Sequence, residues 1–184
     1  MKYTLLVPIL LVIFTAEVAA NAQQRSIDEP TKNLLTVLTE KQWIHGAKNC
    51  DTNDDPALEV FQYDESSYIL RQSKCLSYEA PFIYVLVGDE KTLVIDTGAT
   101  ADAEAFPLYK TVLSLHQKHV GKGQLDEREI LVIHSHSHSD HYSADEQFIG
   151  QPNVTVVAAN NAGINDFFAF EQWPNQQTTL ELGG

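Results

Sequence analysis

The hydrophobic pattern of the chain starts with a helical repeat and then changes to paired strands. In TKNLLTVLTEKQWIHG, residues 31–46, apolar residues recur at helical spacing after Thr31, a suitable cap, and before Gly46, a suitable stop. LEVFQYDESSYILRQS and FIYVLVGDEKTLVIDTG each hold two strand-like runs on either side of a short polar turn. The pattern therefore predicts one amphipathic helix followed by two antiparallel hairpins.

Beyond Gly98 the pattern alternates between helices and strands. A helix is expected in PLYKTVLSLHQKH, beginning at Pro107, and short helices in SADEQFIG and NNAGINDFFAF. EILVIHS and VTVVAA are expected to be strands, and TTLELGG has the alternation of a last strand before a Gly-Gly turn. The runs FIYVLV and TLVI are continuously apolar, which places their hairpin in the middle of a sheet covered on both faces. The prediction is a mixed α/β layered fold.

Length and charge limit the class of protein. The 184 residues are enough for one domain with a real core. Acidic residues outnumber Lys and Arg by 25 to 12, a balance that repels phosphate backbones and anionic lipid. Because the sequence also lacks a basic stripe, nucleic acid is not expected as a partner. The oligomeric state is left open.

The N-terminal stretch has the layout of a cleaved secretory signal. A lysine precedes an apolar run, and the small-residue pattern Ala-Asn-Ala ends at Ala22. A retained membrane anchor is the alternative, but the apolar run is shorter than the ~20 residues that a spanning helix needs. We therefore expect residues 1–22 to be a signal peptide and residues 23–184 to be one domain. The protein is then secreted or periplasmic, with no stable membrane insertion after cleavage.

Cys50 and Cys75 are the two cysteines of the chain. Export would place them in a compartment where a disulfide can persist. Two free thiols or a zinc-binding pair are the alternatives, although the spacing is not the CxxC of a structural zinc site. A disulfide here would serve stability rather than chemistry.

Four of the seven histidines lie in HSHSHSDH, residues 134–141. The run offers one register of ligand-type residues, His136-x-His138-x-Asp140-His141. Two histidines at i and i+2 on a chain that leaves a strand point the same way, and neutral imidazoles suit Zn²⁺. Asp140 adds a carboxylate for a second metal or for a metal-bound water. The run therefore predicts a site for one or two zinc ions at the carboxyl end of a strand.

Two other interpretations of this run are a polar loop that binds metal adventitiously and a serine nucleophile. The apolar strand before the run and the second strand end, LVIDTG, count against a polar loop. Asp96 ends that second strand, where a carboxylate can orient a metal-binding histidine; an ordinary strand-ending turn is the alternative for it. Ser135, Ser137 and Ser139 lack a GxSxG elbow and are interpreted as spacers.

The remaining polar aromatic residues are assigned less specific roles. His116 and His119 lie near the end of a predicted helix, where cations complement the helix dipole, so a surface role is expected. His134 is left over as the last residue of its strand. Tyr142 has two open interpretations, contact with a substrate or packing.

HSHSDH, after ILVIHS and the upstream stretch FIYVLVGDEKTLVIDTGAT, resembles the metallo-β-lactamase superfamily, whose signature is HxHxDH after a strand. The resemblance runs from about Leu58 to the end of the chain. It implies an αββα sandwich with a hydrolytic site of one or two Zn²⁺ ions. In such a site a metal-bound hydroxide attacks an ester, thioester, lactone, lactam or related bond of a small-molecule substrate.

The resemblance also implies a role for each residue of the motif. His136 and His138 match the ligands of the first metal, and Asp140 and His141 match those of the second. Asp140 would also orient the attacking water, which makes it the expected catalytic residue. Asp96 matches the strand-end Asp that supports the metal loop.

The chain departs from the family in its second half. The family supplies a third His, a bridging Asp and a last His from that half, whereas this sequence has no histidine after His141. TTLELGG resembles the strand and turn that precede a Gly-His motif in relatives. We therefore expect a fold truncated to its first half, with impaired or no activity by itself. The alternative is an exported metal-binding or interaction module without catalysis, which would leave sheet edges exposed.

Overall fold

The computed structural model describes residues 29–120, 128–171 and 176–183. The predicted signal peptide, residues 1–22, lies outside these residues. Nine helices and strands and three short 3-10 turns organise the described chain. The helices are α1 (Glu29–Glu40), α2 (Leu108–Val120) and α3 (Asn161–Phe168). The strands are β1 (Leu58–Gln62), β2 (Ser67–Gln72), β3 (Phe82–Val87), β4 (Lys91–Ile95), β5 (Glu129–Ile133) and β6 (Val154–Val156).

The strands form one six-stranded sheet whose spatial order follows the chain, from β1 to β6. The first four strands pair antiparallel, which confirms both predicted hairpins. β4, β5 and β6 then pair parallel, with α2 as the crossover between β4 and β5. The apolar hairpin of β3 and β4 occupies the centre of the sheet, as its continuous hydrophobic runs predict. The predicted mixed α/β fold is confirmed.

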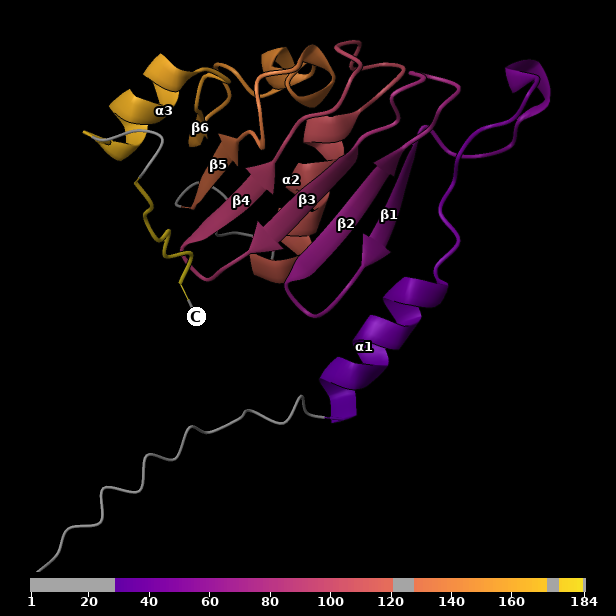
Figure 1. The fold of residues 1–184 in the computed structure, drawn as a ribbon, viewed down its shortest axis with the longest axis horizontal. Helices are drawn as coiled ribbons and strands as arrows, with labels where there is room; N and C mark the ends of the chain where they lie inside the picture. Colours follow the sequence, from indigo (N-terminus) through magenta and orange to yellow (C-terminus); the bar gives the residue numbers. More distant parts are fainter. Residues whose placement is uncertain (1–28, 121–127, 172–175, 184) are drawn as a thin grey trace, which may run out of the picture.

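The larger core lies between the sheet and α2, which runs behind the strands in Figure 1. Alternate residues of the central strands point to this side and are fully buried against the helix. Burial of such side chains stabilises the fold by roughly 1.5–3 kcal/mol each. The core is formed chiefly by Leu70, Ile83, Val85, Val94, Phe106, Leu108, Val112, Val132 and Phe148.

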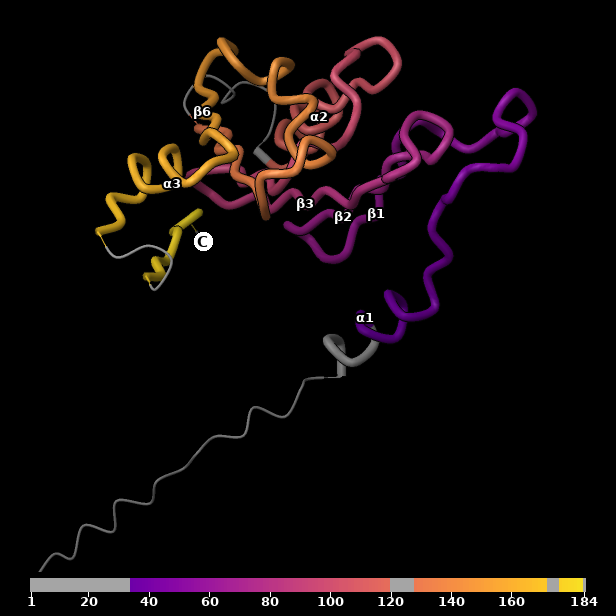
Figure 2. The backbone as a smooth tube through the Cα atoms, turned by 45° about the horizontal axis from the view of Figure 1, so that its top comes forward, coloured from indigo at the N-terminus to yellow at the C-terminus, as the bar shows by residue number. Residues whose placement is uncertain are grey.

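The opposite face of the sheet is covered over β4, β5 and β6 and over only part of β3, where Leu86 packs against the cover. Leu93 and Leu131 pack there under Ile164 of α3 and Leu182 of the C-terminal segment. Figures 1 and 2 show α3 and this segment on the side of the sheet away from α2. Tyr84 of β3, in contrast, is 40% exposed. The prediction that both faces are covered is therefore correct for β4 and wrong for part of β3.

The first helix is shorter than its hydrophobic pattern predicts. α1 ends at Glu40, six residues before the expected stop at Gly46. The chain leaves the helix because the next residues make tertiary contacts: Lys41 pairs with Glu59, and Trp43 packs edge-on against two aromatic rings of the sheet. α1 itself stands away from the sheet in Figure 1. The spacing of apolar residues cannot reveal such tertiary contacts, which compete with continuation of the helix.

The C-terminal segment TTLELGG does not form the predicted strand. It is attached through its backbone to the turn between β3 and β4. Leu182 O accepts hydrogen bonds from the N–H groups of Glu90 (2.8 Å) and Lys91 (3.0 Å), and Gly183 O accepts one from Asp89. A Cβ on Gly88 would lie 2.2 Å from Leu182 O, so this close approach requires glycine. Three hydrogen bonds to two carbonyls therefore hold the segment in place without the repeated pairing of a strand.

The structure joins Cys50 and Cys75 in a disulfide. Cys50 opens a 3-10 turn, and Cys75 lies in the loop between β2 and β3. The bond therefore ties the segment that precedes β1 to the β2–β3 loop. Within the described residues, no helix is long and apolar enough to cross a membrane.

His116 is buried, which corrects its expected surface role. Its side chain lies between α2 and the sheet with 1% exposure, and Nδ1 is 2.7 Å from the hydroxyl of Thr92. His119, one turn later, is exposed as expected. Burial lowers the pKa of His116, and the nearby positive charges of Arg128 and His119 add to that effect.

The buried imidazole predicts a loss of stability in acid. The folded state holds His116 with a pKa below the ordinary 6.5, whereas the unfolded chain takes up the proton at that value. The free energy of unfolding should therefore be unaffected by this group above pH 6.5 and should fall as the pH drops below it. Urea unfolding from about pH 8 to about pH 5 measures this. The H116Q variant should show a shallower fall than the wild type.

The matched control is His119→Gln, which removes an exposed imidazole from the same helix. Its pH profile should stay much closer to the wild type than that of H116Q does, because the charge of His119 is the smallest of the causes that lower the pKa of His116. Parallel profiles for the wild type and H116Q would contradict the assignment, because other groups would then account for the acid sensitivity.

Candidate metal centre

The predicted site residues lie at one edge of the sheet, where β4 and β5 end side by side. These strands are parallel, and their last residues, Ile95 and Ile133, are paired. Asp96 follows β4, and the histidine run follows β5. The two loops are joined by backbone hydrogen bonds from Asp96 N to Ile133 O (2.9 Å) and from Thr97 N to His141 O (2.7 Å). Parallel pairing therefore brings together residues that are about 40 positions apart in the sequence.

Asp96 is the buried anchor of the histidine loop. Asp96 is buried, with 2% exposure. Its backbone has a φ of +69°, a left-handed conformation that Asp tolerates better than most residues. Oδ1 accepts from the backbone N–H of Ser135 (2.7 Å), and Oδ2 accepts from the Ser135 hydroxyl (2.7 Å). Oδ2 also lies 2.8 Å from Nδ1 of His141. One carboxylate thus holds both ends of the predicted ligand run.

The contact with Asp96 determines which nitrogen of His141 is available to a metal. A carboxylate only accepts, so neutral His141 donates from Nδ1 and keeps its lone pair on Nε2. Nε2 lies 3.2 Å from Oδ2 of Asp140. Metal-binding histidines are commonly oriented in this way by a carboxylate on their other nitrogen. Asp96 therefore makes the contact with His141 that its predicted role requires.

The four predicted ligands are neighbours. The ring of His136 lies with its centroid 4.0 Å from that of His141 and 4.7 Å from that of His138. Asp140 and His141 belong to a 3-10 turn, Ser139–His141, which His138 precedes in extended conformation. His136 and His138 are exposed, whereas Asp140 and His141 are half-buried.

The donor chemistry fits zinc, although the donor atoms do not converge on one point. Three imidazoles and a carboxylate are ligands that Zn²⁺ prefers. Among the described residues, no three His, Cys, Asp or Glu side chains form a group tight enough to hold a metal ion. His136 and His138 are exposed side chains, so rotation about their side-chain bonds disturbs no core packing. The residue types and the oriented His141 fit the metal.

The sequence and its fold were compared with known proteins. Residues 79–172 match the family model of the metallo-beta-lactamase superfamily. The chain belongs to this superfamily. Its members are typically metallo-hydrolases, and the predicted family is confirmed. No curated protein matches the chain.

Two solved structures are similar to the chain. TMB-1 is 18% identical, with a TM-score of 0.40, over 68% of this chain and 54% of its own. A metallo beta lactamase from Hirschia baltica is 13% identical, with a TM-score of 0.40, over 61% of this chain and 49% of its own. The chain therefore spans about half the length of these two proteins.

His134 and Asp145 form a second set of contacts beside the histidine motif, and the sequence did not predict these contacts. The side chain of His134 is 2% exposed, and its Nε2 lies 2.9 Å from Oδ1 of Asp145. The same oxygen accepts from the hydroxyl of Thr97 at 2.7 Å. His134 is thus a buried link between the ends of β4 and β5 and the turn that follows the motif. Asp145 carries no signal in the sequence beyond its position four residues after His141.

Ser135 is more than a spacer, which corrects its interpretation. Both its backbone N–H and its hydroxyl donate to Asp96. Its hydroxyl also lies 3.0 Å from Nδ1 of His136. Tyr142 is partly exposed, and its ring centroid lies 6.3 Å from that of His134.

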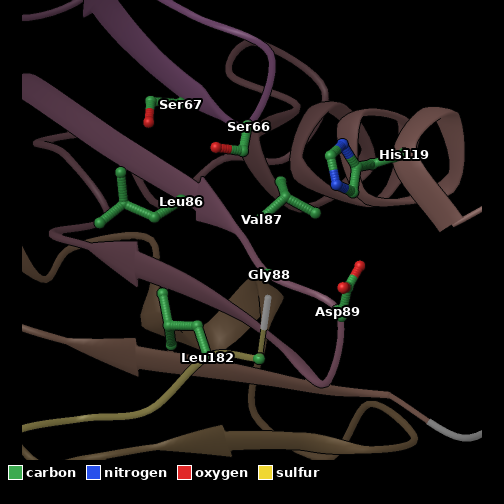
Figure 3. A pocket seen from close by; sticks show the side chains of 9 residues that line it. Ser66, Ser67, Leu86, Val87, Gly88, Asp89, His119 and Leu182 are labelled. Carbon is green, nitrogen blue, oxygen red and sulfur yellow. The ribbon is translucent and has the colours of Figure 1, made fainter.

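Two cavities lie at opposite ends of the central strands. One, of about 430 Å³, opens beside Asp140 and His141 and is bounded by the β2–β3 loop. The other, of about 440 Å³, lies where β3 ends. His119 projects toward it from α2, and Asp89 lies in the turn after β3 that borders it (Figure 3). The cavity beside Asp140 and His141 is the candidate substrate site, because two predicted ligands and Asp96 line it, whereas a smaller cavity of about 260 Å³ is lined by His136 alone of the predicted ligands.

Proposed function

We propose that the chain is the N-terminal half of an exported zinc-dependent hydrolase that cleaves an ester, thioester, lactone, lactam or related bond of a small molecule. Membership of the superfamily supports hydrolysis. The observation that carries the assignment is the contact of Asp96 with Nδ1 of His141, which leaves Nε2 for a metal beside the carboxylate of Asp140. A merely polar loop would not need a buried carboxylate behind it.

Each residue of the motif has a role in this proposal. His136 and His138 would bind the first zinc ion, and Asp140 and His141 the second. When bound, zinc lowers the pKa of water toward 7 and polarises the scissile bond. Asp140, half-buried at the cavity, would accept a hydrogen bond from the attacking water and orient it. Asp96 would hold His141 and the loop in place.

The extent of the chain bears on whether it is active by itself. It has no histidine after His141 and spans about half of the two solved structures. A catalytic zinc ion usually takes three protein ligands and keeps one open position. We therefore expect further ligands from residues after position 184 of the complete protein. An in-frame Gly-His motif in the coding region shortly after Gly184 would support this, and a stop codon there would contradict it.

The decisive experiment measures zinc binding and turnover together. H136A and D140A should each lower the zinc affinity of the chain by about tenfold or more, because each removes a direct ligand. H119A, which removes an exposed histidine on α2, should bind zinc as the wild type does. Zinc binding is measured by equilibrium dialysis and metal analysis. Equal zinc affinity of the wild type and all three variants would overturn the proposal.

Turnover separates the enzyme from a non-catalytic metal-binding module. The complete protein should hydrolyse at least one compound in a panel of esters, thioesters, lactones and lactams, and H136A should abolish that activity. Zinc binding without turnover on the panel would favour the module. Sequencing the N-terminus of the mature protein tests export, since cleavage after residue 22 is expected.

A further inference from the structure

Among the described residues that line the cavity beside the motif there is one arginine and no lysine: Arg71, which faces the same space as Asp140 and His141. Arg71 lies near the end of β2, on the side of the sheet away from α2, and is paired in register with Phe82 of β3. Its guanidinium carbon lies 4.2 Å from the centroid of the Phe82 ring. This stacking holds the plane of the guanidinium in a defined position.

Within the described residues, the charge of Arg71 has no acidic partner. No ion pair or hydrogen bond of its guanidinium to a carboxylate is present, and its Nε is buried without a hydrogen-bond acceptor. The nearest acid by strand register is Glu59 of β1, directly across from Arg71. The carboxylate of Glu59 is already engaged, because it pairs with Lys41 and accepts from the N–H of Ile44 at 3.0 Å.

Arg71 is half-buried, so its guanidinium has lost part of its contact with water. Burial lowers the pKa of Arg71, which shows that its charged form is less well solvated than that of an exposed arginine. Arginine nevertheless stays protonated in proteins. An anion in the cavity would therefore restore part of the interaction that burial removed, and a planar carboxylate matches the two-pronged guanidinium best.

The rest of the cavity wall is largely apolar near Arg71 and acidic near the motif. Ala80, Pro81, Phe82 and Tyr84 form the apolar part. Asp140 lies at the motif end, where it would repel an anion unless metal is bound. Glu79 also lines the cavity, but it is exposed, so solvent and salt screen its charge. This distribution favours a ligand with a carboxylate at the Arg71 end and an apolar body beside it.

The geometry points to Arg71 as the residue that binds a carboxylate group of the substrate and so selects anionic, partly apolar substrates. The position of the scissile bond at the motif rests on the proposed function. The binding of a carboxylate by Arg71 is independent of it. The net charge of −13 disfavours anions near the chain as a whole, and the positive charge of Arg71 opposes this effect locally.

The test compares phenylacetate with its neutral counterpart phenylacetamide by NMR titration on the full chain, which is first stripped of metal with a chelator that is then removed by dialysis. The wild type should bind phenylacetate about tenfold or more tightly than phenylacetamide, because only the carboxylate makes charge-assisted hydrogen bonds. R71Q should lose this preference. R71K should keep part of it, because lysine retains the charge but not the fork.

Lys74→Gln provides the matched control, since it removes one positive charge from an exposed side chain in the neighbouring loop. Its preference should equal that of the wild type. The inference is overturned if the wild type shows no preference, if R71Q or R71K keeps it in full, or if K74Q loses it. Because no metal is present, a failure of the zinc proposal leaves this result unaffected.

Discussion

Replacing Asp96 with asparagine is expected to weaken zinc binding by about 10- to 100-fold without removing a metal ligand. The carboxylate accepts from Ser135 twice and orients His141 through Nδ1. An amide keeps the shape but offers one acceptor oxygen and a donor, so at least one of these contacts is lost. Asparagine also tolerates the left-handed backbone at this position, φ +69°, better than an alanine does. Zinc affinity is measured by competition with a chromophoric chelator.

The same substitution should lower the free energy of unfolding by about 1–3 kcal/mol, because Asp96 is buried and its partners would be left unsatisfied. Asp102→Asn is the control: it makes the same chemical change at an exposed residue, which accepts a hydrogen bond from the N–H of Glu104. It should alter zinc affinity less than twofold. If D96N bound zinc as tightly as D102N, Asp96 would be a structural residue with no part in orienting the ligands.

Removing the disulfide is expected to lower the free energy of unfolding by about 3 kcal/mol. Cys50 and Cys75 are separated by 25 positions, and opening a loop of that length increases the entropy of the unfolded chain. Urea unfolding of the C50A/C75A variant and the wild type under oxidising conditions measures the difference. A difference below about 1 kcal/mol would show that the unfolded chain is not substantially constrained by the bond.

Reduction provides the internal control for this prediction. In dithiothreitol the wild type and C50A/C75A should unfold at closely similar urea concentrations, since both then lack the cross-link. A large remaining difference would mean that the two side chains, rather than the bond, are responsible. The bond also restrains the β2–β3 loop, whose residues Glu79, Ala80 and Pro81 line the cavity beside the motif.

The candidate site was predictable where its chemistry is local. The spacing of His136, His138, Asp140 and His141 is a property of six consecutive positions, and the structure keeps their side chains together. Asp96 was predictable for a related reason, because the apolar run before it marks the end of a buried strand. Parallel pairing then brings such ends to one edge.

The neighbours of that site were not predictable. Asp145 meets His134 and Thr97, and Arg71 reaches the cavity from β2. These contacts depend on the order of the strands and on the direction in which each loop leaves the sheet. A sequence pattern reports neither, because it records only whether a position is apolar and how often apolar positions recur.

The sequence by itself determined the six observed strands, the two hairpins, the run of candidate ligands and the family. Each follows from local periodicity or from a short motif, and local preferences act within a few residues. The tertiary structure alone decided where α1 ends, how the C-terminal segment attaches, and that His116 is buried while Arg71 is left without an acidic partner. In each of these cases the outcome depends on competition between distant groups for the same space or the same hydrogen bond, and only packing resolves that competition.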